Sequence, residues 1–166
     1  MNLLIKVYKM KTLLIILCLI PSMFLDAQVI DWNNFNEKTI NNIMFDKLNI
    51  YTKTEGGYTI IASNVKSSEI YNLIKRNSGK LSMNEIGIVI NDKLPEQFVG
   101  VFNSISHKDI QDEIITYEDI VHKCFIEWKS SPSDSFFLIG YGSRVEIDSY
   151  YNRKTETLYI SALFIM

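Results

Sequence analysis

The sequence predicts an α+β fold, a layered α-β-α sandwich with a small antiparallel sheet and a C-terminal hairpin. Two observations lead to this expectation. Apolar residues recur at helical spacing in three segments between residues 35 and 128, and strand-like alternation closes the chain over 144–164. Because helices dominate before the terminal strands instead of alternating with them, the layout is typical of α+β domains whose helices cover a sheet.

The amino-terminal segment has the layout of a secretory signal peptide over residues 1–27. Three lysines precede the apolar run TLLIILCLIPSMFL, and Ala27 offers a small residue for cleavage. The run is shorter than the roughly 18–20 apolar residues of a transmembrane helix, and Pro21 interrupts it. Translation could start at Met1 or at Met10. We therefore expect a protein that is secreted or held in the periplasm or cell envelope, with no transmembrane helix after processing.

The remaining residues, 28–166, are enough for one domain with a single core. They hold 14 basic and 18 acidic residues, a formal net charge of −4. A mildly acidic chain without a run of Lys and Arg argues against a nucleic-acid partner. Cys124 is the one cysteine left after processing, so no disulfide within the chain is expected.

Two helices are expected in the first half of this domain. Residues 35–51 place apolar side chains on one helical face, with Asn34 and Asn36 as candidate caps. The second helix, 63–75, is less regular, and the sequence Asn-Ser-Gly that follows it at 77–79 is expected to stop it.

Residues 81–107 differ in character from the helices before them. The runs EIGIVI and QFVGVFNSIS are short, rich in β-branched and aromatic residues, and separated by turn-forming residues. These features predict strands or extended segments rather than helix.

The third helix, residues 117–128, is the clearest element in the chain. Its apolar residues follow the spacing i, i+3, i+4, i+7, i+8, i+11. Thr116 and Asp119 have the spacing of a capping box. The Ser-Pro pair at 131–132 resembles an N-cap followed by proline in the first turn, which predicts a short helix ending at Gly140.

The end of the chain alternates twice between apolar and polar residues and predicts a hairpin. In its first strand, Val145 and Ile147 alternate with Glu146 and Asp148, and the turn follows at 152–154. The second strand alternates Leu158, Ile160, Ala162 and Phe164 with Tyr159 and Ser161.

The stretch EDIVHKCFIEWKSSPSD, followed by FFLIGYGSRVEID and the closing TETLYISALF, resembles the carboxy-terminal half of the CAP domain superfamily, the sperm-coating or cysteine-rich secretory protein group. Those domains have a helix ending in Trp-x-x-Ser-Pro-x-His, a short helix, an Ile-Gly-x-Gly-like turn and antiparallel strands. The matching residues, in order, are Trp128, Ser131, Pro132, Ile139, Gly140, Gly142, Tyr159 and Phe164. The resemblance implies that residues 28–166 form a single CAP-like domain, although only 117–142 is rich in pattern.

In that family, two histidines and two acidic residues face a central cleft and can hold a divalent metal such as zinc. Here Asp134 stands where the motif has its histidine, and Tyr71 and Asn72 stand where the other histidine is expected. Asn103 ends a Gly-Val-Phe-Asn sequence in place of a Gly-Glu-Asn motif. The resemblance thus implies a cleft lined by these four residues and His122 that has lost most of its metal-binding set. We expect no bound metal, no cofactor and no catalytic residue.

The other reactive side chains have structural interpretations. His107 lies in a polar loop and is expected to be solvated, and His122 borders the apolar stripe of the third helix without a paired ligand. Cys124 falls on that stripe, where it acts as a small hydrophobe. The negative charge of Asp134 can interact favourably with the dipole of the expected short helix, and its carboxylate can accept a hydrogen bond from the capping residue Ser131. The serines Ser131, Ser133 and Ser135 lack a Gly-x-Ser-x-Gly frame.

Two functions of different classes follow. The first is an exported, non-catalytic CAP-like module that binds a protein, glycan or lipid partner at the cell envelope or outside the cell. The second is a secreted hydrolase, because carboxylates held about 5–10 Å apart can perform acid-base chemistry on sugars. The carboxylates available for that role are Glu69, Glu85, Glu96 and Asp134. The binding module is favoured, since no spacing in the sequence brings these carboxylates together.

Overall fold

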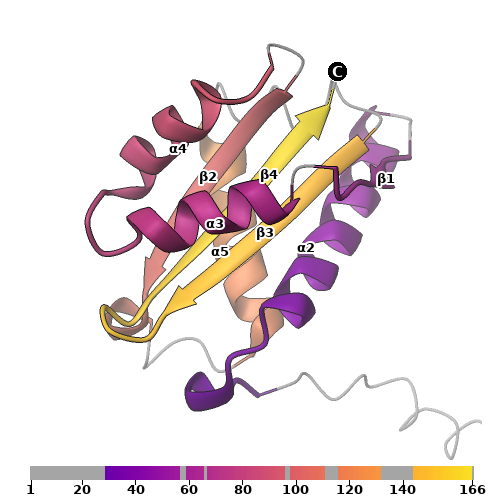
Figure 1. Ribbon diagram of the computed structural model, residues 1–166. Helices are drawn as coiled ribbons and strands as arrows, with labels where there is room; N and C mark the ends of the chain where they lie inside the picture. The colour runs from indigo at the N-terminus through magenta and orange to yellow at the C-terminus, as the bar shows by residue number, and fades with distance from the viewer. Residues whose placement is uncertain are drawn as a thin grey trace, which may run out of the picture.

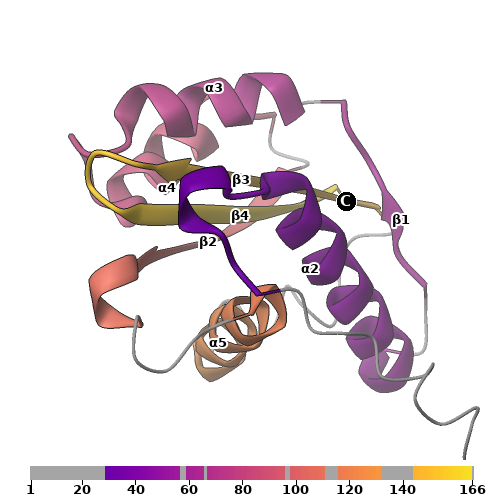
Figure 2. The same cartoon turned by 90° about the horizontal axis from the view of Figure 1, so that it is seen from below.

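The computed structural model describes residues 29–56, 59–65, 67–95, 98–110, 116–131 and 144–165. Its main elements are α2 (Glu37–Tyr51), β1 (Ile61–Ala62), α3 (Ser67–Asn77), α4 (Met83–Asn91), β2 (Phe98–Ser106), α5 (Tyr117–Ser130), β3 (Arg144–Asn152) and β4 (Thr157–Ile165). Short helical turns lie at η2 (Trp32–Asn34), η3 (Thr52–Gly56) and η4 (His107–Asp109). The sheet forms the middle layer, with α3 and α4 on one side and α2 and α5 on the other (Figures 1 and 2). The predicted α+β sandwich is confirmed.

The sheet has the strand order β1-β3-β4-β2. β3 and β4 form the predicted C-terminal hairpin, and β4 also pairs with β2 in antiparallel register. β1 adds a short parallel pairing, in which Ile61 lies opposite Arg144 and Ala62 opposite Val145. The sheet is therefore mixed rather than wholly antiparallel, and β1 covers only the first residues of the outer edge of β3.

Each face of the sheet carries its own hydrophobic core. Successive residues of a strand point to opposite faces, so Val101 and Ile105 of β2 join the core with α2 and α5, whereas Phe98 joins the core with α3 and α4. Burial on both faces explains why nearly every residue of β4 is buried, including its polar Ser161, which is 0% exposed.

The polar residues of β3 are buried as well. Alternation in an antiparallel strand ordinarily leaves the polar set toward water, but Glu146 is 0% and Asp148 is 4% exposed. Both lie on the face that α3 covers, and a carboxylate oxygen of Glu146 accepts a hydrogen bond of 2.9 Å from the Oγ of Ser63. The alternation of apolar and polar residues thus locates β3 correctly, while the layer of α3 and α4 causes the burial of its polar residues.

The prediction of a strand at EIGIVI is wrong, because this segment forms α4. Ser82 caps the helix: its Oγ accepts from the Glu85 N–H at 3.3 Å, and the Glu85 carboxylate accepts from the Ser82 N–H at 2.8 Å. This capping box favours a helix over the local β preference. Gly87, unusual within a helix, allows α4 to approach the sheet, since a Cβ there would lie 2.8 Å from the ring of Phe102. The neighbouring prediction is confirmed, because QFVGVFNSIS contains β2.

The other predicted helices are confirmed. The Asn36 side chain accepts from the Thr39 N–H at 3.1 Å and caps α2. α3 begins and ends slightly later than expected, and α5 begins with the predicted capping box of Thr116 and Asp119. The leader 1–27 and the short helix expected after 131–132 lie outside the described residues. Within the described ranges, no helix combines the length and apolarity needed to cross a membrane.

Candidate functional site

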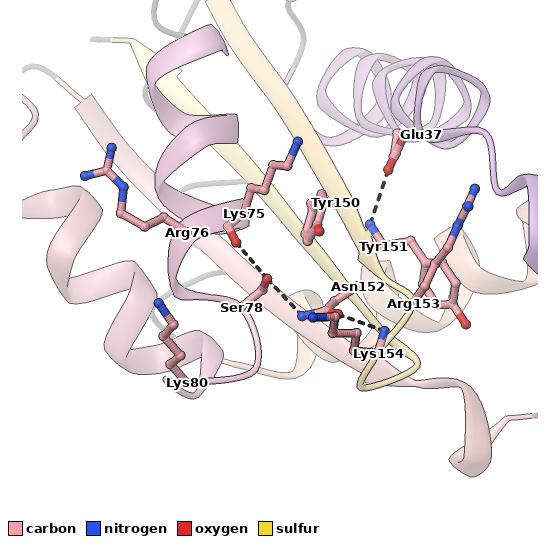
Figure 3. A pocket seen from close by; sticks show the side chains of 10 residues that line it. All are labelled: Glu37, Lys75, Arg76, Ser78, Lys80, Tyr150, Tyr151, Asn152, Arg153 and Lys154. Atoms are coloured by element: carbon pink, nitrogen blue, oxygen red, sulfur yellow. Dashed lines mark hydrogen bonds between the residues drawn. The ribbon is translucent and has the colours of Figure 1, made fainter.

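A pocket of about 560 Å³ lies where the hairpin turns, beside the end of α3 and the start of α2 (Figure 3). Its volume is within the range of about 300–1,000 Å³ that small-molecule sites occupy. We call it the cationic pocket, and its lining consists of Glu37, Lys75, Arg76, Ser78, Lys80, Tyr150, Tyr151, Asn152, Arg153 and Lys154.

The end of α3 forms one wall of the cationic pocket. Gly79 stops the helix with a φ of +76°, a backbone conformation that glycine adopts without steric cost. Its N–H donates a hydrogen bond of 3.0 Å to the hydroxyl of Tyr159 in β4. A Cβ at Gly79 would lie 2.9 Å from the Cγ2 of Thr155. The glycine therefore lets the end of α3 lie directly against the hairpin.

A chain of hydrogen bonds then fixes the two walls to each other. The Nδ2 of Asn152 donates to the Oγ of Ser78 at 3.1 Å, and this hydroxyl donates to the Lys75 carbonyl at 3.0 Å. The Lys154 N–H donates to the Oδ1 of Asn152 at 3.0 Å (Figure 3). The part-buried pair of Ser78 and Asn152 thus fixes the backbone at two of the lysines, Lys75 and Lys154.

The start of α2 closes the third side. Because β1 leaves most of the outer edge of β3 unpaired by strands, α2 supplies polar partners there. The Tyr151 N–H donates to a carboxylate oxygen of Glu37 at 3.4 Å, and the Oγ of Ser149 donates to the Oδ1 of Asn41 at 2.7 Å. These bonds position Glu37 as the one carboxylate of the cationic pocket.

The cationic pocket is strongly positive. Its lining includes five cations, Lys75, Arg76, Lys80, Arg153 and Lys154, and one carboxylate, Glu37, in a chain whose formal net charge is −2. Among the described residues, no carboxylate lies within ion-pairing distance of these five cations. Cations gathered in a concave site raise the local concentration of anions, so the arrangement suits a negatively charged ligand.

Tyrosines at the pocket stay protonated at neutral pH. Burial raises the pKa of Tyr71, and the charge of Glu37 raises it further. Burial also raises the pKa of Tyr151, with a further contribution from Glu156 that Arg153 partly opposes. Each hydroxyl can therefore donate one hydrogen bond and accept others.

A second pocket of about 440 Å³ adjoins the first and shares Tyr151 and Arg153 with it. We call it the aromatic pocket, because Trp32 stacks on His107 with ring centroids 4.1 Å apart and lies 5.2 Å from the ring of Tyr151. Its lining consists of Ile30, Asp31, Trp32, Asn33, His107, Tyr151, Arg153 and Glu156. The expectation of a solvated His107 is wrong, since its ring is half-buried against Trp32.

The residues that the CAP resemblance assigned to a cleft are only partly near this site. Tyr71 of α3 borders the cationic pocket, because its ring contacts Tyr150 edge to face at 5.7 Å and lies 5.8 Å from the Nζ of Lys75. Asn72 is exposed on the same helix. Asp134 lies outside the described residues.

The other two assigned residues lie in the layer on the opposite side of the sheet. The Nδ2 of Asn103 donates to a carboxylate oxygen of Glu127 in α5 at 2.6 Å. The Nδ1 of His122 lies 3.1 Å from the Nζ of Lys47 in α2. The fold therefore does not bring Tyr71 together with Asn103 and His122.

The carboxylates considered for hydrolysis do not form a pair in the described structure. Glu85 serves as a helix cap, and the hydrogen bond from the Ser82 N–H lowers the pKa of its carboxyl, the opposite of what a general acid requires. Glu69 is exposed on α3 and lines neither pocket. Glu96 and Asp134 lie outside the described residues.

Cys124 is a free, fully buried cysteine of α5, as its place on the apolar stripe predicts. Burial raises the pKa of its thiol far above the ordinary value. The thiolate that nucleophilic catalysis requires is therefore disfavoured.

The sequence interpretation missed the cationic pocket. Its five cations come from two segments far apart in the sequence, 75–80 and 153–154, so no single run of basic residues marks them. One signal was present: basic residues in the last turn of the helix at 63–75 and in the hairpin turn at 152–154. Their proximity depends on how α3 lies over the sheet.

No protein-family model and no curated protein matches the chain. Among solved structures, the chain is similar to an outer surface protein from Borrelia burgdorferi, with a TM-score of 0.49 and 14% sequence identity over 84% of this chain and 97% of that chain. This similarity assigns no family to the chain.

Proposed function

We propose that this protein is an exported, non-catalytic binding domain that recognises an anionic ligand in the cationic pocket. One observation carries the proposal: five cations and one carboxylate line a pocket of about 560 Å³ in a chain with a net charge of −2. Like charges held together repel one another, and an anion that accepts charge-assisted hydrogen bonds from them relieves this repulsion.

The types of cation suit groups with several oxygens. Arg76 and Arg153 carry planar guanidinium groups that can bind a sulfate, phosphate or carboxylate through two parallel hydrogen bonds. The lysines act as point charges on flexible side chains. The site therefore favours compact oxyanions.

Export is supported by the leader at residues 1–27. The proposed location is the periplasm, the cell envelope or the medium. Amino-terminal sequencing of material from the envelope and medium tests this part, with a start near Gln28 as the expected result. An intact leader in a cytoplasmic pool would contradict it.

We also propose that the chain is a divergent CAP-like domain. The three-layer sandwich, α5 ending near the Trp-x-x-Ser segment and the closing hairpin support this relation. The separation of Tyr71 from Asn103 across the sheet weighs against a shared family cleft at those residues. No observation favours the hydrolase alternative, because Glu85 is occupied as a cap.

The binding proposal is tested by nuclear magnetic resonance titration of inorganic sulfate and phosphate, with chloride at equal ionic strength as the reference. The amides of 75–80 and 152–154 should shift. The double variant Lys75→Glu and Lys154→Glu should weaken binding at least about tenfold, since each hydrogen bond to a charged group contributes about 1.5–3 kcal/mol.

The matched control is the double variant Lys53→Glu and Lys93→Glu, which makes the same change in net charge at exposed residues that line neither pocket. This control should bind nearly as well as the parent. Equal losses in both variants would show that only the net charge matters and would overturn the proposed site.

A further inference from the structure

Building on the proposed function, we propose that the cationic and aromatic pockets are two subsites for one ligand, an anionic saccharide of at least two sugar units. Its sulfate or carboxylate groups bind in the cationic pocket, and a neutral, hydroxyl-bearing unit binds in the aromatic pocket.

Continuity between the two pockets is the first reason. Tyr151 and Arg153 line both of them. A ligand that contacts the Arg153 guanidinium from the cationic side therefore already reaches the border of the aromatic pocket. The raised pKa of Tyr151 keeps its hydroxyl protonated, so this border offers a hydrogen bond without a negative charge.

The walls of the aromatic pocket match the chemistry of a sugar ring, which has an apolar C–H face and a polar rim of hydroxyls. Aromatic side chains supply an apolar surface in fixed orientation, and the ring of Trp32 lies 4.1 Å from that of His107 and 5.5 Å from that of Phe35, measured between ring centroids. Asp31 fixes the turn that carries Trp32, because its carboxylate accepts from the Asn33 N–H at 2.9 Å.

Glu156 is left as the acceptor for hydroxyl groups. Its backbone carbonyl accepts a hydrogen bond from the His107 N–H at 2.7 Å, whereas its carboxylate has no hydrogen-bond or ion-pair partner among the described residues. Its φ is 51°, in the left-handed region where glycine or asparagine is usual. A strained glutamate at a hairpin turn is consistent with a role for its side chain.

Other anionic partners fit this pair of pockets less well. A lipid requires exposed aliphatic surface beside the charges, but none of the exposed large hydrophobic residues in the described ranges lines either pocket. These residues are Val29, Ile50, Ile61, Val65, Ile88 and Ile126. A long nucleic acid would also be repelled by the rest of the chain, because the net charge is −2 even with the pocket cations included.

The test follows the two indole N–H resonances of the full chain by nuclear magnetic resonance, assigned with a Trp32→Phe variant. A sulfated tetrasaccharide should shift the Trp32 signal and leave that of Trp128, which is 1% exposed, in place. Inorganic sulfate should shift the amides at 152–154 without moving the Trp32 indole. The unsulfated tetrasaccharide should bind far more weakly.

Substitution at Glu156 separates the two subsites. Glu156→Gln should weaken tetrasaccharide binding about tenfold, because hydroxyl groups lose a charged acceptor, and should leave sulfate binding unchanged. Glu118→Gln, at an exposed residue of α5, is the matched control and should have no effect.

The outcomes distinguish this inference from the proposed function. The two-subsite inference would be overturned if sulfate binds but the sulfated tetrasaccharide neither shifts the Trp32 indole signal nor binds more weakly to Glu156→Gln. The proposed anion site would remain supported in that case. Absence of any sulfate shift at 152–154 would instead overturn the proposed function. Tighter binding to anionic lipid vesicles or to RNA than to the sulfated tetrasaccharide would also overturn the inference.

Discussion

The side-chain amide of Asn152 donates a hydrogen bond of 3.1 Å to the hydroxyl of Ser78, across 74 positions of sequence. This bond joins the end of β3, where the hairpin turn begins, to the residue that follows α3. Since the cations of the proposed site are divided between these two segments, the geometry of the site depends on it.

Asn152→Ala should lower the free energy of unfolding by about 1–3 kcal/mol, because the mostly buried Ser78 hydroxyl loses its donor and the Lys154 N–H loses its acceptor. Urea denaturation measures this change. Asn152→Asp keeps the acceptor for Lys154 and removes only the donor, so its loss should be smaller. If both variants unfold like the parent, the hydrogen bond does not organise the pocket.

Glu156→Gly should raise the free energy of unfolding by up to about 1 kcal/mol, because glycine adopts the positive φ of this position without the steric cost that a Cβ brings. Thermal melts would show the rise, with Glu156→Gln as a neutral reference. The same variant should bind the sulfated tetrasaccharide more weakly. A destabilised Glu156→Gly would mean that the turn does not strain the glutamate.

Trp128→Ala should cost about 3–5 kcal/mol, as large aromatic truncations in a core do, since this side chain is 1% exposed in the core of α2 and α5. Trp128→Phe should cost less. It keeps most of the apolar contact and removes an indole N–H that has no acceptor among the described residues. A loss below about 1 kcal/mol for Trp128→Ala would contradict the core position.

Cys124 should react with thiol reagents only when the protein unfolds, because burial disfavours its thiolate.

The stability of the protein should also depend on pH through Cys124. The pKa of its thiol is raised in the folded state, so the folded protein keeps a proton that the unfolded chain releases above about pH 8.5. The buried thiol of Cys124 therefore contributes to the free energy of unfolding below that pH. This contribution is lost as the pH rises, by at most about 1.4 kcal/mol per pH unit. Denaturation at about pH 7 to about pH 9.5 of the parent and Cys124→Ala measures the difference in slope.

A saturating chelator should leave the melting temperature unchanged. Within the described ranges, no group of three or more His, Cys, Asp and Glu side chains is placed to hold a metal ion, and zinc sites normally assemble about four donors. Loss of a ligand bound to the native state would lower the melting temperature. Calorimetric zinc binding of one-to-one stoichiometry that disappears in Asp134→Ala would refute this expectation.

Local patterns in the sequence were enough to locate α5, the capping box of Thr116 and Asp119, and the C-terminal hairpin. These features depend on residues within a few positions of each other, so their spacing carries the information. The segment at α4 shows the limit of such patterns. The β-branched residues of EIGIVI favoured a strand, whereas the capping box of Ser82 and Glu85 and the close approach of Gly87 to Phe102 favour the helix.

The sequence by itself determined the α+β class, the apolar stripes and the place of Cys124 and Trp128 in the core, because periodicity records which side of an element is buried. Only the tertiary structure decided that Glu146 and Asp148 are buried and that Lys75 and Lys154 share a pocket. The reason is physical: burial of a polar face requires a second layer, and a charge cluster requires distant segments to meet. Neither condition can be predicted from the spacing of residues within one segment.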